Sequence, residues 1–200
     1  MFDKLLTKEE IKKCKKLHLK KGEILFKENE KCDSVFLLLE GEILISSSDI
    51  DGNEEIYNYL KSGDMIANIL VFAKNNTFLG DAIAQKNTTI LQIKKDILLE
   101  ILKNNNLFLD WFLSYNSNET MESKIKAKLL SKRSIKDRII YYLTINGGII
   151  DESVTSISKK IMINRVCVSR IISDLEKQNI IKRKGKTIIY SLSSKRFING

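Results

Sequence analysis

The residues that most often carry catalysis, metal binding or redox chemistry are few in this sequence. The 200 residues include three cysteines, Cys14, Cys32 and Cys167, and one histidine, His18. Such widely spaced cysteines match neither a CxxC redox pair, nor a zinc-ligand cluster, nor a disulfide framework, and they suit a reducing compartment. Because the chain also shows no acid–base pair or nucleophile triad, we do not expect an enzyme.

A second set of side chains has the type and spacing needed to bind a polyanion such as a nucleic acid. The stretch Arg165 to Gln178 is expected to be a helix that Asn164 caps, with its core residues at the i, i+3, i+4, i+7 spacing. Those core residues are Val168, Ile171, Ile172 and Leu175. Arginine can hold guanine through two hydrogen bonds. The outer face of this helix therefore supplies the predicted base-reading residues, which are Arg165, Val166, Ser169, Arg170 and Ser173.

Two further helices are expected to position this face. Ser134 to Ile145 has helical spacing and stops at Asn146-Gly147-Gly148, and Thr155 to Ile161 makes a two-turn helix. Met162 to Asn164 then forms a tight turn before the reading helix. A short helix, a tight turn and a second helix are typical of a helix-turn-helix, whose second helix faces base edges with its N-terminal part.

A basic hairpin follows the reading helix. Ile180 to Leu192 is expected to form two β segments around a Lys-Gly turn, with four cations at the tip: Lys182, Arg183, Lys184 and Lys186. Alone, such a tip is more often a solvated turn. Beside a helix-turn-helix it favours a wing that contacts phosphates, which positions a protein without specifying sequence.

The charge distribution agrees with this placement. The formal net charge is +9, but residues 1–130 hold 19 Lys and Arg against 20 Asp and Glu, a net charge of −1. Residues 131–200 hold 15 against 5, a net charge of +10. The alternative is a merely solvated basic surface, but concentrated positive charge suits a polyanion because it releases counterions from phosphates.

The first half of the chain is expected to form β-structure. Short β segments are Glu23–Phe26, Ser34–Leu39, Glu42–Ile45, Glu55–Leu60 and Thr89–Ile93. Turn signals separate them at Gly22, Gly41, Asp51-Gly52-Asn53 and Ser62-Gly63-Asp64. This spacing predicts a small antiparallel barrel or sandwich with helical flanks.

A long helix is expected between the two zones. Residues 95–132 contain no glycine, the chain has no proline, and Asn104 to Asn106 suggest a break between a short helix and a longer one. The longer one has a seam with steps of three and four, at Phe108, Trp111, Tyr115, Asn118, Glu122, Ile125 and Leu129. We expect this seam to be a dimer interface, and the alternative is a helix packed on its own barrel.

No run approaches the roughly 20 apolar residues that a membrane helix needs, and the start Met-Phe-Asp-Lys lacks the apolar core of a secretion signal. We therefore expect no membrane association and a cytoplasmic location.

The chain resembles the CRP/FNR family of bacterial transcription regulators along nearly its whole length. The β region resembles the family's cyclic-nucleotide-binding-type β-roll in Gly22–Phe26, Val35–Ile43 and Gly63-Asp64. Ile157–Ile181 resembles the family's helix-turn-helix, and Gly185–Tyr190 resembles its wing.

The resemblance implies an α+β fold with an N-terminal antiparallel β-roll (cupin or jelly-roll-like), a long dimerisation helix and a C-terminal winged helix-turn-helix. The corresponding domains are residues 1–94, 95–132 and 133–200. It also implies a homodimer on a roughly palindromic double-stranded DNA operator, with RNA polymerase as a partner if the protein activates.

Departures from the family concern the effector. Members that bind cyclic AMP hold it with a Gly-Glu and an Arg-Ser pair, and here Ala67-Asn68 and Phe78-Leu79 stand at those places. Phenylalanine and leucine cannot hold a phosphate, so we do not expect cyclic AMP as effector. The region instead offers a candidate apolar effector pocket or filled core, with core favoured, formed by Ile69, Leu70, Phe72, Phe78 and Leu79.

Other family cofactors are not expected either. Cys14 and Cys32 are too few for a four-iron iron–sulfur cluster, and His18, which we expect at the surface, would be the one histidine for haem. Cys167, within the reading helix, is expected to be packing. We thus expect an unknown small-molecule effector or none. The alternative function is a ligand-sensing regulatory subunit that does not bind DNA.

The reading helix departs as well. Well-studied members use an Arg, then a Glu, then a second Arg, whereas here Val166 stands at the glutamate position between Arg165 and Arg170. A glutamate accepts a hydrogen bond from cytosine, but valine can only contact a thymine methyl. The sequence therefore predicts an operator richer in A/T than the common family half-site.

Overall fold

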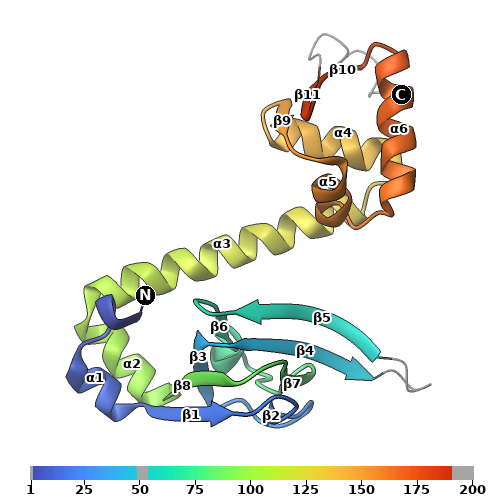
Figure 1. Cartoon of the computed structure of the whole chain (residues 1–200). Helices are drawn as coiled ribbons and strands as arrows, with labels where there is room; N and C mark the ends of the chain where they lie inside the picture. Colours follow the sequence, from blue (N-terminus) through green and yellow to red (C-terminus); the bar gives the residue numbers. More distant parts are fainter. Residues whose placement is uncertain (1, 49–53, 191–200) are drawn as a thin grey trace. The chain divides into compact units, whose positions relative to one another are not determined.

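The computed structural model describes residues 2–48 and 54–190 (Figure 1). Its contacts divide the chain into two compact units, 1–118 and 119–200. The first unit is built on antiparallel sheets and the second on a helical module with a small sheet. The predicted α+β class, with a β-roll, a long helix and a winged helix-turn-helix, is confirmed.

Two four-stranded antiparallel sheets form the roll of the first unit. One sheet has the order β1-β8-β3-β6 and the other β2-β7-β4-β5 (Figure 1). Their strands are β1 (Lys15–Leu19), β2 (Ile24–Phe26), β3 (Ser34–Glu40), β4 (Glu42–Ser48), β5 (Glu54–Lys61), β6 (Met65–Ile66), β7 (Asp81–Ala84) and β8 (Thr88–Lys94). The predicted turn at Asp51-Gly52-Asn53 lies outside the described residues.

The core of the roll lies between side chains of both sheets. Strand β3 is buried at every position from Ser34 to Leu38, and it pairs with β8 on one side and β6 on the other. From the other sheet, Ile43 of β4 and Ala82 of β7 are fully buried in the same core. Burial of this apolar area is the main stabilisation available to the unit.

The turn between β3 and β4 explains one of the glycines in the family-like motif. Gly41 has φ +104°, a conformation that residues with a Cβ rarely adopt. A Cβ built there would lie 2.6 Å from the backbone Cα of Thr88. Glycine is therefore required at this position by both the backbone conformation and the close approach of β8.

The N-terminal segment is fastened to the start of the long helix. It contains a 3-10 turn (Phe2–Lys4) and helix α1 (Lys8–Lys13), whose capping box joins Thr7 and Glu10. The Nδ2 of Asn105 donates to Glu10 Oε2 (3.0 Å), and Asn105 Oδ1 accepts from the backbone N of Phe108 (3.0 Å). Asn105 thus ends α2 (Lys95–Asn104) and caps α3 (Asn106–Leu130), at the predicted break.

Both ends of the predicted dimer seam on α3 contact the cores of the chain itself. Phe108 is fully buried in the core of the roll, and Trp111 and Tyr115 pack against that core. Leu129 is 2% exposed in the core of the second unit, and Ile125 packs against it. The helical spacing of these residues therefore reflects packing within the chain. For the start of α3, this is the alternative stated above, a helix packed on its own barrel. Asn118 and Glu122 are exposed.

The second unit is a three-helix module with a three-stranded sheet of order β10-β11-β9. Its elements are α4 (Ile135–Ile145), β9 (Ile149–Asp151), α5 (Val154–Lys160), α6 (Arg165–Lys177), β10 (Ile181–Lys184) and β11 (Thr187–Tyr190). Ile139, Leu143, Ile157, Ile172 and Ile188 meet in one core and connect helices to sheet. The predicted helices and hairpin are confirmed to within about a residue, up to Tyr190.

Within residues 2–48 and 54–190, no helix combines the length and the apolar character that crossing a bilayer would need.

Candidate nucleic-acid interface

Helices α5 and α6 are joined by a short turn. The backbone N of Ile163 donates to the carbonyl of Ser158 (3.0 Å), which closes the end of α5. Met162 adopts φ +55° in this turn, a left-handed conformation that glycine or asparagine usually occupies. Asn164 then caps α6, since its Oδ1 accepts from the backbone N of Val166 at 2.8 Å. The expected cap is confirmed.

The outer face of α6 carries the predicted reading residues. Arg165, Val166, Ser169 and Arg170 are exposed, and the Val166 side chain reaches 72% exposure. The opposite face is held by Val168, Ile172 and Leu175, which are at most 1% exposed. A helix anchored on one face presents its other face in a fixed orientation, which base readout requires.

Ser173 differs from the other four predicted reading residues. It is half-buried, and its Oγ donates to the carbonyl of Ser169, one turn earlier, at 3.1 Å. This bond uses the single hydroxyl hydrogen within the helix, so Ser173 retains only acceptor capacity.

The hairpin of β10 and β11 forms the predicted wing. The strands pair antiparallel from Ile181 opposite Tyr190 to Lys184 opposite Thr187, and Gly185 turns the chain with φ +60°. Strand β9, which the sequence did not predict, pairs with the other side of β11. The four cations of the wing, Lys182, Arg183, Lys184 and Lys186, are all exposed.

A polar network centred on Glu152 fastens α5 to α4. Its Oε1 accepts from Tyr142 Oη (2.8 Å) and Lys160 Nζ (2.8 Å), and its Oε2 accepts from Ser156 Oγ (2.5 Å). Burial opposes the charged form, but the bonds from Lys160, Ser156 and Tyr142 outweigh it and lower the pKa of Glu152 to about 2. The sequence offered no signal for this network, which joins residues from three segments.

Helix α4 also contacts the helix-turn-helix directly. The Nη1 of Arg138 donates to the carbonyl of Ile161, at the end of α5, at a distance of 3.4 Å. The bond is long, but it places a cation against a helix C-terminus, where the helix dipole favours it.

Arg165 and Arg170 form no ion pair with any residue in 2–48 or 54–190. Within the described residues, the ion pair of the second unit is Lys160 with Glu152, and neither Arg165 nor Arg170 has one. Their guanidinium groups therefore keep all their donors for an external acceptor.

The five residues of the candidate effector pocket differ widely in burial. Phe78 is buried, with its ring stacked on that of Phe26. Ile69 and Leu79 are 53% and 74% exposed, and Phe72 lies at the surface with Lys95 Nζ 5.4 Å from its ring centroid. Leu70 is half-buried. The core interpretation fits Phe78, which is buried in the core of the roll, and Leu70, which packs against that core, whereas Ile69 and Leu79 are exposed.

The positions that the resemblance aligns with cyclic-AMP contacts are Ala67-Asn68 and Phe78-Leu79. Ala67 keeps a left-handed conformation, φ +61°, without being glycine. The Nδ2 of Asn68 donates to Asn116 Oδ1 of α3 at 2.9 Å, so this side chain is bonded within the protein. Neither pair offers a carboxylate for the ribose or a guanidinium for the phosphate.

The cysteines and the histidine do not form a reactive centre. Burial, followed by the charge of Glu10, raises the pKa of Cys14 to about 11, and Cys32 is buried with a raised pKa. Cys167 is half-buried, and His18 is exposed with Thr89 Oγ1 at 3.3 Å. Among the residues that the structure describes, no group of three His, Cys, Asp or Glu side chains could hold a metal ion.

Fold and site together define a winged helix-turn-helix protein with a cyclic-nucleotide-binding-type roll. The profile of the cyclic nucleotide-binding domain matches residues 16–105. The cAMP-activated global transcriptional regulator CRP of Escherichia coli O157:H7 is 25% identical over 189 residues, which cover 82% of this chain and 84% of that protein. Over most of its length, the chain is thus similar to bacterial transcription regulators of the CRP type.

Solved structures share the fold. The Thermus thermophilus catabolite activator protein has a TM-score of 0.56 at 16% identity, covering 95% of this chain and 92% of that one. The global regulator CLP of Xanthomonas campestris, titled as responsive to c-di-GMP, has a TM-score of 0.53 at 14% identity, covering 91% and 96%.

Proposed function

We propose that this protein regulates transcription by binding a two-fold symmetric DNA operator as a homodimer, with α6 as the reading helix. The observation that carries the proposal is the outer face of α6, where Arg165 and Arg170 are exposed and unpaired within the described residues. An exposed face of this kind, in a region with a net charge of +10, matches the chemistry of a DNA major groove.

Each element has a distinct role in this proposal. Arg165 and Arg170 donate to guanine edges, and Val166 contacts a thymine methyl group. The wing cations contact phosphates and set the register of the protein on the duplex. Valine stands where well-studied members have a glutamate, which accepts a hydrogen bond from cytosine. The preferred half-site is therefore richer in A/T than the common family half-site.

The homodimer is supported by the exposed part of α3. Leu113 and Met121 are 54% and 56% exposed on this helix, and Asn118 and Glu122 of the predicted seam are also exposed. Exposed apolar side chains on a long helix suit pairing with a second copy. Two reading helices would then meet half-sites about one helical turn, roughly 34 Å, apart.

The effector is proposed to be something other than a cyclic nucleotide, or absent. Proteins of this fold do not share one effector: the curated relative is named as cAMP-activated and the Xanthomonas neighbour as c-di-GMP responsive. Here the positions of the cyclic-AMP contacts hold Ala67, Asn68, Phe78 and Leu79.

We further propose that the protein acts in the cytoplasm without enzymatic activity, and contacts RNA polymerase where it activates. A ligand-sensing subunit without DNA binding would leave the exposed Arg165 and Arg170 without a role.

Selection of double-stranded DNA from a random pool by the full chain tests the proposal. We expect a two-fold symmetric, A/T-rich site, and a roughly 10- to 100-fold loss of affinity for it in Arg170→Ala. Arg170→Lys retains the charge and should lose most of the same affinity, because the two-bond contact is lost. Lys124→Ala on α3 is the charge-matched control. No DNA binding at low salt, or unchanged affinity in Arg170→Ala, would contradict the proposal.

A further inference from the structure

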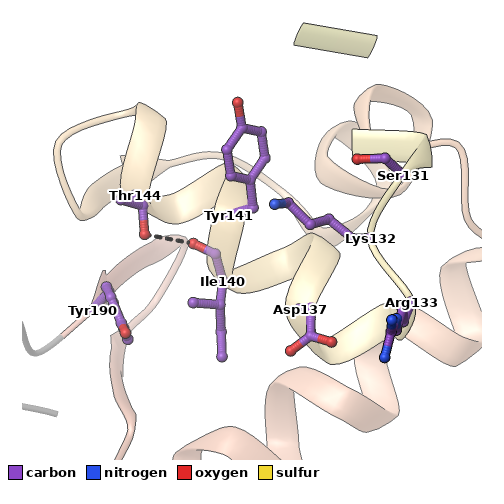
Figure 2. Close-up of a pocket in the computed structure, with 8 residues that line it drawn as sticks. All are labelled: Ser131, Lys132, Arg133, Asp137, Ile140, Tyr141, Thr144 and Tyr190. Atoms are coloured by element: carbon purple, nitrogen blue, oxygen red, sulfur yellow. Dashed lines mark hydrogen bonds between the residues drawn. The ribbon is translucent and has the colours of Figure 1, made fainter. Parts of the chain in front are cut away.

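We propose that a groove beside α4, in the DNA-binding unit, binds a small organic anion with an apolar body. The groove has a volume of about 430 Å³ and is lined by residues of α4, of the segment before it and of β11 (Figure 2). Ligand pockets typically measure about 300–1,000 Å³. This site is separate from the roll and goes beyond the function proposed above.

Carbon atoms form most of the groove. Ile140 and Tyr141 on α4 and Tyr190 at the end of β11 contribute an aliphatic side chain and two aromatic rings. Thr144 Oγ1 donates to the carbonyl of Ile140 at 2.9 Å, the dashed line in Figure 2, so its hydroxyl hydrogen is used within the helix. This part of the groove fits the apolar body of a ligand.

Two cations, Lys132 and Arg133, also line the groove. Lys132 is half-buried, and its Nζ lies 4.6 Å from the ring centroid of Tyr141 (Figure 2). Within the described residues, neither Lys132 nor Arg133 has an ion pair. A lysine held against an aromatic ring still has N–H donors available. An anion with an apolar body could accept hydrogen bonds from these donors and also fill the apolar part of the groove.

One acidic group also faces this groove. Asp137 belongs to its lining, and its Oδ2 accepts from Ser134 Oγ at the start of α4 (2.7 Å). Two cations and one acid leave the lining with a net charge of +1. This charge favours a monoanion over a neutral or cationic ligand of the same shape.

The remaining faces of α4 connect the groove to the reading module. Ile139 and Leu143 pack in one core with Val168 and Ile172 of α6, and Arg138 bonds to the carbonyl of Ile161. A ligand in the groove would therefore stabilise the helix on which α6 packs, and would raise the stability of the second unit.

Fluorescence titration of the full chain with 8-anilinonaphthalene-1-sulfonate, an aromatic sulfonate, tests the site. We expect saturable binding that weakens about tenfold in Lys132→Gln/Arg133→Gln. Lys124→Gln/Lys126→Gln, two exposed cations of α3 outside the groove, is the matched control and should keep the wild-type affinity. Thr144→Phe, which fills the groove without changing charge, should also weaken binding.

Competition then identifies the class of ligand. Decanoate or indole-3-acetate should displace the probe, whereas decanol, which has an apolar chain without charge, should not. Unchanged affinity in the double variant, or equal displacement by decanol and decanoate, would overturn the proposal. Probe binding that is seen only after removal of residues 191–200 would also overturn the proposal, because it would mean that the chain itself fills the groove. None of these measurements requires DNA binding, so they stand apart from the test above.

Discussion

The ring of Phe78 lies on the ring of Phe26, with the centroids 3.6 Å apart and the planes 8° from parallel. The resemblance to regulators that bind cyclic AMP aligns Phe78 with the arginine that holds the cyclic phosphate in those proteins. Here the position is 5% exposed and belongs to the apolar core of the roll. A charged phosphate brought to this point would lose its hydration without gaining a cationic partner.

We therefore predict that cyclic AMP at 1 mM leaves the thermal unfolding of the protein unchanged. A ligand present at about 100 times its Kd would stabilise the folded chain by about 2.7 kcal/mol, enough to raise Tm by several degrees. The cAMP-activated relative from Escherichia coli serves as the positive control. A comparable rise in Tm for this protein would show that the ligand is held by other groups.

Replacing Gly41 by alanine should destabilise the roll severely. The new Cβ would meet the backbone of Thr88 at 2.6 Å, and the residue would also be strained at φ +104°. We expect a loss of about 3 kcal/mol or more in the free energy of unfolding, measured by denaturant titration. Gly22→Ala is the matched control: Gly22 also has a positive φ, +88°, but no atom within 4 Å of the added Cβ. It should cost only the backbone strain, about 1 kcal/mol. Equal losses would remove the steric explanation.

Met162→Gly should stabilise the second unit. Met162 holds φ +55° in the turn between α5 and α6, and its side chain is 43% exposed. Glycine adopts this conformation without strain, and little burial is lost. We expect a gain of up to about 1 kcal/mol, seen as a higher Tm by circular dichroism. A lower Tm would mean that contacts of the Met162 side chain outweigh the strain.

The second unit should lose stability as the pH falls from about 4.5 towards 2. The pKa of Glu152 is about 2 in the folded chain and 4.5 in the reference state. A lowered pKa contributes stability that is fully present above about pH 4.5 and is lost as the pH falls towards 2. After allowance for partial exposure, we expect about 2 kcal/mol from this group.

The matched variant for this window is Glu152→Gln. It should be less stable than the wild type at pH 7 and lose less stability between pH 4.5 and 2. The measurement is urea unfolding followed by circular dichroism at several pH values. Parallel pH curves for the two proteins would assign the acid sensitivity to other carboxylates.

Val166→Glu should change the sequence that the protein selects. A glutamate side chain accepts a hydrogen bond from the amino group of cytosine, which valine cannot do. Since Val166 is 72% exposed, the substitution should leave folding unchanged. We expect selected sites to gain a C·G pair at one position in each half-site, with about 1–3 kcal/mol of discrimination. An unchanged selected sequence would show that residue 166 does not face the bases.

Much of the second unit could be predicted because its signals are local. Asn164 as a cap, Gly147-Gly148 as a stop and the apolar spacing within α6 each act over a few residues. Strands β1, β6, β7 and β9 were missed. Lys15–Leu19 is rich in charge, and Met65–Ile66, Asp81–Ala84 and Ile149–Asp151 are at most four residues long. Such strands exist because of the neighbour with which they pair, which a local pattern does not identify.

The sequence indicated that α3 has an apolar face, but it did not indicate what that face packs against. The aromatic residues at the start of α3 have helical spacing whether they face a second copy or the roll of the same chain. Phe108 and Trp111 proved to pack on the roll, near Phe2, a residue about a hundred positions earlier. Likewise, nothing in the pattern of apolar residues between Ile69 and Leu79 indicated which side chains would be exposed.

The position of Trp111 has a spectroscopic consequence. It is the one tryptophan of the sequence, and its ring packs between Phe2, Phe108 and Tyr115 of the first unit. The core of the second unit contains tyrosines but no described tryptophan. Intrinsic tryptophan fluorescence therefore reports melting of the roll alone, whereas far-ultraviolet circular dichroism reports both units. Comparing the two signals during heating would show whether the roll and the reading module lose their structure in one cooperative step or in two.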